Sequence, residues 1–129
     1  MAFILIPKNG EEVKINAWNW RPTLELLHNA HLIGDDLYGR MGRDEREAIV
    51  DADTAARIAD FLDERLRTMK AGDRIRADLT VTDKARKPLI IAPGMQTDQI
   101  DVVDVYSAAY EWLVQLRDFA RTCGGFEVV

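Results

Sequence analysis

This sequence has few of the side chains from which most catalytic sites are built. Its 129 residues include one cysteine, Cys123, one serine, Ser107, and two histidines. A lone cysteine excludes an internal disulfide and any metal site made of several cysteines, and it fits a reducing compartment. The chain also lacks the glycine-rich signatures of mononucleotide and dinucleotide binding. We therefore expect no resident cofactor.

Long apolar runs are missing as well. No run approaches the roughly 20 residues that cross a bilayer. The first residues lack the charged start and the apolar block of a secretion signal. We expect a soluble, cytoplasmic protein with no membrane partner. With 47% apolar residues the chain is large enough for one core and too short for two ordinary domains, so we predict a single domain over residues 1–129.

Both ends of the chain have the pattern of β-strands. Apolar residues 3–6 and 13–15 flank Asn9-Gly10, and Asn-Gly between apolar runs is a strong hairpin signal. Residues 126–129 follow Gly124-Gly125 and are almost wholly apolar. Further strands are expected at 48–50, 75–81 and 89–91. The last is a possible hairpin partner of 75–81.

Three segments have the spacing of amphipathic helices. Apolar residues recur at intervals of three and four over 55–69, where Asp51 is placed to cap the helix, and over 105–123. Pro22 suits the first turn of a helix that ends near Ile33, before Gly34. We therefore predict an α+β domain, with an antiparallel sheet that includes both terminal segments and is covered by about three helices. Residues 94–100 are expected to form an exposed, mobile connection.

Neither candidate nucleophile has the surroundings that would activate it. Ser107 is predicted on the polar face of the last helix, without a strained turn to present it. Cys123 is predicted to be buried at the carboxyl end of the same helix, where burial and the helix dipole both disfavour a thiolate. We predict no catalytic residue.

A metal-dependent enzyme is a second interpretation, based on His28, His31 and Asp35. Spacings of three and four can gather side chains on one face of a helix. Gly34 interrupts the helix between them, and a helical projection places His28 on the polar side and His31 at the edge of the core. We favour one exposed histidine and one interfacial histidine with a hydrogen-bonded partner, and no metal site.

The segment around Gly39-Arg-Met-Gly42 is the predicted recognition loop. The Gly-x-x-Gly pattern also occurs where K-homology domains clamp nucleic-acid backbones, but the acidic residues around it would repel phosphate. A turn that needs glycine for positive φ explains it better. Because loops on a rigid scaffold carry most recognition, we predict protein binding here. The predicted contact residues are Asp35, Asp36, Tyr38, Arg40, Arg43 and Asp44.

The net charge of −5 is unevenly distributed. Residues 65–87 carry eight basic side chains and three acidic ones, about +5, which leaves the remainder near −10. Solvated faces explain most such segments, but binding of a nucleic acid or another anion through residues 65–87 is an alternative.

Two tryptophans, Trp18 and Trp20, flank Asn19. In an extended segment they would point to the same side, either into the core or onto a binding surface rich in aromatics. Both alternatives remain open from the sequence. Trp112, on the apolar stripe of the last helix, is predicted to lie in the core.

Three pieces of the sequence resemble a group of small uncharacterised bacterial proteins: residues 16–26, with Trp20-Arg21-Pro22, residues 50–62, and residues 116–128, with Gly124-Gly125-Phe126. No catalytic residues come with this resemblance. Small acidic single-domain bacterial proteins of this kind are often toxin-neutralising immunity proteins, by analogy of type. Because the sequence offers no activated nucleophile and no cluster of metal ligands, and because its charge is segregated, the leading prediction is a non-enzymatic protein that recognises another protein, such as an immunity or accessory protein.

Overall fold

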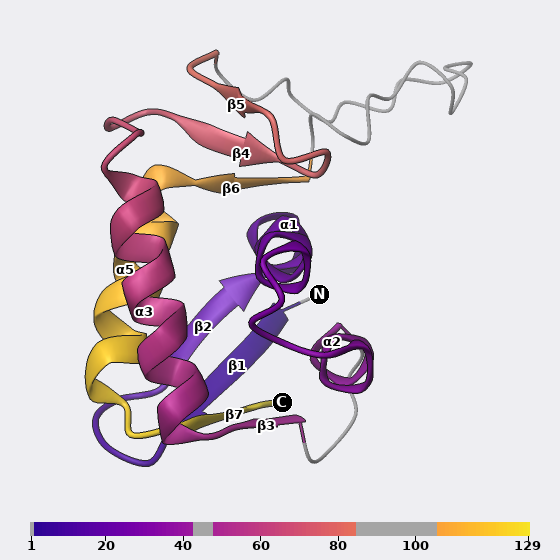
Figure 1. The fold of residues 1–129 in the computed structure, drawn as a ribbon, viewed down its shortest axis with the longest axis vertical. Helices are drawn as coiled ribbons and strands as arrows, with labels where there is room; N and C mark the ends of the chain where they lie inside the picture. Colours follow the sequence, from indigo (N-terminus) through magenta and orange to yellow (C-terminus); the bar gives the residue numbers. More distant parts are fainter. Residues whose placement is uncertain (1, 43–47, 85–105) are drawn as a thin grey trace.

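The computed structural model describes residues 2–42, 48–84 and 106–129, and it has an α+β fold (Figure 1). A four-stranded antiparallel sheet has the order β2-β1-β7-β3. Its strands are β1 (Ala2–Pro7), β2 (Val13–Asn16), β3 (Ala48–Val50) and β7 (Phe126–Val128). The prediction of an antiparallel sheet that contains both terminal segments is confirmed.

A second, three-stranded sheet has the order β5-β4-β6. Its strands are β4 (Arg74–Arg76), β5 (Val81–Thr82) and β6 (Ser107–Ala109). The expected single strand over 75–81 is therefore wrong: the chain turns after Arg76, where Leu79 has φ 70° and its N–H donates to Arg76 O at 2.8 Å. The predicted partner strand 89–91 and the predicted connection 94–100 lie outside the described residues.

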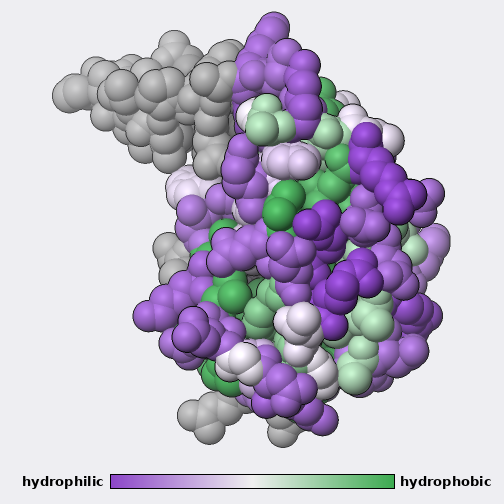
Figure 2. Space-filling model, turned by 90° about the vertical axis from the view of Figure 1, so that its left-hand side faces the viewer, coloured by the Kyte–Doolittle hydropathy of each residue, from purple (hydrophilic) through white to green (hydrophobic). Residues whose placement is uncertain are grey.

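Four helices are described in this structure: α1 (Ala17–Asn29), α2 (Asp35–Met41), α3 (Ala52–Leu66) and α5 (Tyr110–Thr122). Helices α3 and α5 lie side by side, and two ion pairs of 3.2 Å join them, Arg117 to Asp63 and Arg121 to Asp60 (Figure 1). Hydrophilic residues cover most of this side of the molecule, with hydrophobic residues between them (Figure 2). No helix among the described residues is long and apolar enough to cross a membrane.

The core lies between the helices and one face of the four-stranded sheet. Alternation along the strands decides which side chains reach it, because neighbouring residues of a strand point to opposite faces. Phe3 and Leu5 of β1 and Phe126 and Val128 of β7 are each at most 3% exposed. Residues that alternate with them along the strands, such as Ile6, face away from the helices, and Ile6 is 44% exposed.

The two tryptophans of the Trp-Asn-Trp segment point in different directions, because the segment is helical and not extended. Trp20 is fully buried between Phe3 and Trp112, with ring centroids 6.2 and 6.3 Å away, and its indole Nε1 donates to Met41 O. Trp18 is half-buried against Tyr106, with the ring centroids 4.6 Å apart. The prediction that Trp112 lies in the core is confirmed, since it is 5% exposed.

Two predicted helix boundaries are wrong. Helix α1 begins at Ala17 and ends at Asn29, because Asn16 Oδ1 accepts from Asn19 N at 3.0 Å and caps the helix well before Pro22. The last helix begins only at Tyr110, and residues 107–109 pair with β4 instead. Ser107 is consequently not on a polar helix face but fully buried in a strand.

Candidate functional site

Helix α2 occupies the segment in which a recognition loop was predicted. Asp35 and Asp36 lie in its first turn, where the helix dipole favours carboxylates. Met41 is fully buried and anchors the helix to the core. The loop prediction is thus wrong, because this burial offsets the cost of about 1 kcal/mol for Gly39 inside a helix. Gly42 has φ −87°, so the expected positive-φ turn is absent there too.

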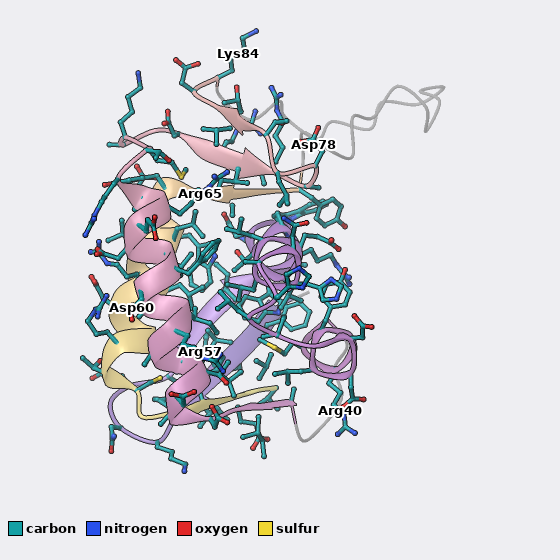
Figure 3. All side chains as sticks on the ribbon, in the orientation of Figure 1. Arg40, Arg57, Asp60, Arg65, Asp78 and Lys84 are labelled. Carbon is teal, nitrogen blue, oxygen red and sulfur yellow. The ribbon has the colours of Figure 1, made fainter. Side chains whose placement is uncertain are left out.

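The predicted contact residues are distributed along this helix. Asp35, Asp36, Tyr38 and Arg40 all belong to α2, whereas Arg43 and Asp44 lie outside the described residues. Arg40 pairs with Asp36 one turn earlier, with Nε 3.0 Å from Oδ2. Figure 3 shows Arg40 at the outer side of α2. The described part of the predicted site is therefore one helix surface and not a loop.

His28 of α1 joins this surface through two contacts with α2. Its ring stacks on that of Tyr38, with centroids 4.3 Å apart and planes inclined by 23°. Its Nε2 lies 2.6 Å from Asp35 Oδ1. Sequence reasoning grouped His28 with Asp35 but expected Gly34 to separate them. The chain in fact reverses after α1, which brings Asp35 back beside His28.

Tyr38 is held at its other end by Glu25 of α1. Its hydroxyl donates a short hydrogen bond to Glu25 Oε1. This hydrogen bond, followed by partial burial and the negative charge of Glu25, raises the pKa of Tyr38 above its ordinary value of 10.0. Asp35, His28, Tyr38 and Glu25 therefore form one connected cluster across the two helices, here called the α1–α2 cluster.

A small hollow opens beside the α1–α2 cluster. It is lined by Arg21, Leu24, Glu25, Tyr38, Gly39 and Gly42. Its volume of about 280 Å³ is just below the roughly 300–1,000 Å³ typical of ligand pockets. Gly42 contributes no side chain to the hollow, and a Cβ there would be in ordinary contact with Tyr38 O at 3.4 Å and Leu24 Cδ1 at 3.5 Å. A hollow of this size fits one protruding side chain better than a cofactor.

His31 lies on the other side of His28 and is exposed, so the prediction that it lies at the core edge is wrong. The helix has already ended, and His31 has φ 60°, so a helical projection does not apply to it. A second hollow is lined by His28, Asn29, His31, Ile33, Gly34 and Asp35. Within residues 2–42, 48–84 and 106–129, no group of three or more His, Cys, Asp or Glu side chains is placed to hold a metal ion.

The basic segment is divided between two places in the described structure. Arg65 is in the last turn of α3 and Arg67 caps that helix, where it pairs with Asp63 at 3.3 Å. Arg74 is on β4 and only 5% exposed, with its Nε donating to Lys84 O and its Nη1 to Ser107 Oγ. Figure 3 shows Lys84 well away from Arg65, at the far end of the small sheet. Residues 85–87 are outside the described part.

Both candidate nucleophiles are enclosed. Ser107 Oγ accepts from Arg74 Nη1 at 3.1 Å, deep in the small sheet. Cys123 is 1% exposed, and its Sγ donates to Ala120 O at 3.6 Å. The predicted burial of Cys123 is confirmed. The predicted position of Ser107 on a polar helix face is wrong, because this residue is buried in β6.

Comparison with known proteins gives no match: no protein-family model, no curated protein and no solved structure is significantly similar to this chain. The resemblance to small bacterial proteins therefore stays a prediction. What can be inferred about function depends on the geometry of the α1–α2 cluster and the hollow beside it.

Proposed function

We propose that this protein is a non-enzymatic binding protein, of the immunity or accessory kind, that recognises another protein through the surface formed by α1 and α2. The observation that carries the proposal is the ordered α1–α2 cluster beside a hollow the size of one side chain. The binding residues that we propose are Arg21, Glu25, His28, Asp35, Asp36, Tyr38 and Arg40.

Preorganisation supports this proposal. Tyr38 is fixed by stacking on one side and by a hydrogen bond at its hydroxyl, although it is only half-buried. A side chain already held in place loses little rotamer entropy on binding, and tyrosine and arginine are enriched among the residues that dominate protein interfaces. A tyrosine locked at the surface, next to Arg21, is therefore suited to recognition.

The charges of this surface indicate the kind of partner. Glu25, Asp35 and Asp36 are acidic, Arg21 and Arg40 are basic, and the whole chain carries −5. These five charges sum to −1 on a chain of −5, and net negative charge attracts a basic partner and increases the rate of encounter. We propose a partner with a basic face and one protruding side chain that enters the hollow.

The alternatives have less support. Binding of nucleic acid through residues 65–87 would use exposed cations, but Arg74 is buried and Arg67 is paired with Asp63. A metal-dependent enzyme would need a third ligand beside His28 and Asp35, and the described residues offer no such group.

Affinity capture tests the proposal. The tagged chain is incubated with an extract of the organism that encodes it, and the proteins that it captures are identified. The experiment is repeated with the variants Tyr38→Ala and Arg21→Ala and with the control variant Arg57→Ala. Arg57 is exposed on α3 and pairs only with Asp53 among the described ion pairs. We expect one basic protein with the original chain and with Arg57→Ala, and roughly tenfold less with the other two variants.

Thermal unfolding of each variant separates a loss of binding from a loss of folding. The proposal is overturned if the captured proteins are the same for all four chains while all remain folded. Capture of RNA or DNA in place of a protein, lost on raising the salt concentration, would favour the basic segment instead.

A further inference from the structure

The face of the four-stranded sheet that points away from the helices carries a compact apolar patch. The strand register shows which residues form this patch, because paired residues on neighbouring strands point to the same side of a sheet. Ile4 pairs with Lys14 and is joined to Val129 by two backbone hydrogen bonds, and Ile6 and Ile49 both pair with Glu127. This outer face therefore displays Ile4, Ile6, Ile49 and Val129 around Glu127, with Lys14 on β2.

These aliphatic side chains are open to solvent. Ile49 is 56% exposed, Ile6 44% and Val129 37%, while Ile4 is half-buried. Three of the four exposed large hydrophobic residues in the described structure thus lie on this one sheet face. Scattered apolar residues at a surface need no explanation, whereas these three share one sheet face that points away from the described helices.

We propose that a second copy of this chain packs on this outer face to form a symmetric dimer. The charges on this face fit a second copy, because they can pair reciprocally with their own symmetry mates. Apart from its aliphatic residues, the face carries one cation on β2, Lys14, and one anion on β7, Glu127. Strand β1 runs between them.

A two-fold axis that crosses β1 between Ile4 and Ile6 makes the face complementary to itself. Such an axis exchanges the positions of Lys14 and Glu127, so each lysine meets the glutamate of the other copy. Isologous contacts require this reciprocity. The isoleucines of β1 then pack on their own symmetry mates at the centre, where burial contributes most to an interface.

The dimensions of the face set the strength of the dimer. The sheet is four strands wide, with about 4.8 Å between strands, and each strand contributes about four residues with a rise of ~3.4 Å. The projected area of the face is therefore roughly 250 Å². This is well below the ~800 Å² per partner of a standard stable interface, so the dimer is weak and concentration-dependent. None of the residues of the α1–α2 cluster takes part, and the inference does not depend on the proposed function.

Sedimentation of the full chain over a range of concentrations tests the inference. We expect a monomer–dimer equilibrium that Ile6→Lys weakens at least roughly tenfold, since it places a like charge on each side of the axis. Val81→Lys is the matched control, because Val81 is similarly exposed, at 43%, but belongs to the small sheet. It should leave the equilibrium unchanged.

Charge reversal tests the two-fold arrangement itself. Lys14→Glu and Glu127→Lys should each weaken self-association, whereas the two variants mixed together should associate more strongly than either alone. Circular dichroism establishes that each variant is folded. A monomer at the highest soluble concentration, or a dimer that Ile6→Lys leaves intact, would overturn the inference, as would a mixture that associates no better than its components.

Discussion

The indole Nε1 of Trp112 on α5 donates a 2.9 Å hydrogen bond to Thr23 Oγ1 on α1, and the Thr23 hydroxyl donates in turn to Asn19 O at 2.7 Å. Thr23 is fully buried, so one hydroxyl satisfies both partners away from water. We predict that Thr23→Val, which keeps the side-chain shape, lowers the free energy of unfolding by about 1–3 kcal/mol, because it leaves the indole N–H unpaired in the core.

Urea unfolding followed by tryptophan fluorescence measures this loss. Thr122→Val on α5 is the control, since the Thr122 hydroxyl bonds Asp118 O at 3.3 Å in an exposed position. Its effect should stay within about 0.5 kcal/mol. Equal effects of the two substitutions would contradict the structural role assigned to Thr23.

Gly125 is required by its conformation and by its surroundings. Its φ is +106°, and a Cβ would lie 3.0 Å from Val50 O. Gly10, at φ +97° in the hairpin loop, has nothing within 4 Å of a Cβ and is the matched control. We expect Gly10→Ala to cost about 1–2 kcal/mol from backbone strain, and Gly125→Ala to cost a further ~1 kcal/mol or more, because β3 must shift.

Thermal or chemical unfolding of the two glycine variants checks this difference. If the two variants lost the same stability, the close approach of Gly125 to β3 would have no energetic consequence. Because both glycines have a similar positive φ, both variants carry similar backbone strain. The difference between their losses of stability therefore measures the crowding of the new Cβ against β3.

Asp51 gives a prediction for acid pH. Its carboxylate accepts from Thr54 N at 2.7 Å at the start of α3, and the hydrogen bonds from the Thr54 N–H and then from its hydroxyl hold the pKa of Asp51 below its usual value. A pKa depressed in the folded state contributes stability that is present above the unfolded value, about 3.9, and is lost as pH falls through the folded pKa.

Asp51→Asn keeps an acceptor for the cap but does not titrate. We expect the original protein to exceed this variant in stability by a constant margin from neutral pH down to about pH 4, and the margin to shrink below that. Hydrogen bonds from Thr80 also lower the pKa of Asp78, so the stability of the original protein alone would include the titration of both aspartates. The difference between the original protein and Asp51→Asn isolates the contribution of Asp51. A margin that persists into strong acid would refute the assignment to Asp51.

The α1–α2 cluster makes a prediction at alkaline pH. The hydrogen bond to Glu25 is the largest cause of the raised pKa of Tyr38, so Glu25→Gln should lower that pKa toward 10.0. Because the folded pKa lies above the unfolded one, the stability from this bond is present below about pH 10 and is lost as pH rises through the folded value.

Ultraviolet titration of tyrosinate, with Tyr38→Phe subtracted to isolate this residue, measures the shift. Glu64→Gln, at an exposed position of α3, is the control and should leave the titration of Tyr38 unchanged. A Tyr38 titration identical in all the carboxylate variants would show that the cluster is not coupled in solution.

The sequence predicted correctly those elements that are determined by residues close together in the chain. The Asp51 cap is confirmed because its bond to Thr54 spans one turn, and β7 is confirmed because alternation and the preceding glycines define it within a few residues. Ser107-Ala108-Ala109 continues the apolar spacing of α5 and was predicted as helix. Only its pairing with Arg74–Arg76, distant in the sequence, makes it a strand.

The candidate site was predicted in composition but not in geometry. Tyr38, Asp35 and Arg40 were identified as surface residues, yet Glu25 and Arg21 were missed, because they precede the segment by more than two helical turns. His31 could not be placed, since its φ of 60° comes from the reversal between α1 and α2. A tyrosine thirteen residues after a glutamate carries no signal until the two helices are packed together.

Strand β7 lies in the interior of its sheet, between β1 and β3, although its residues follow those of every other described strand. During translation, the β1–β2 hairpin and β3 are therefore made long before the strand that joins them exists. Until then their apolar sides have no partner across the gap, and we expect the incomplete chain to be more prone to aggregate than the finished one. Closing a sheet from such distant segments also makes folding slow for a protein of this size.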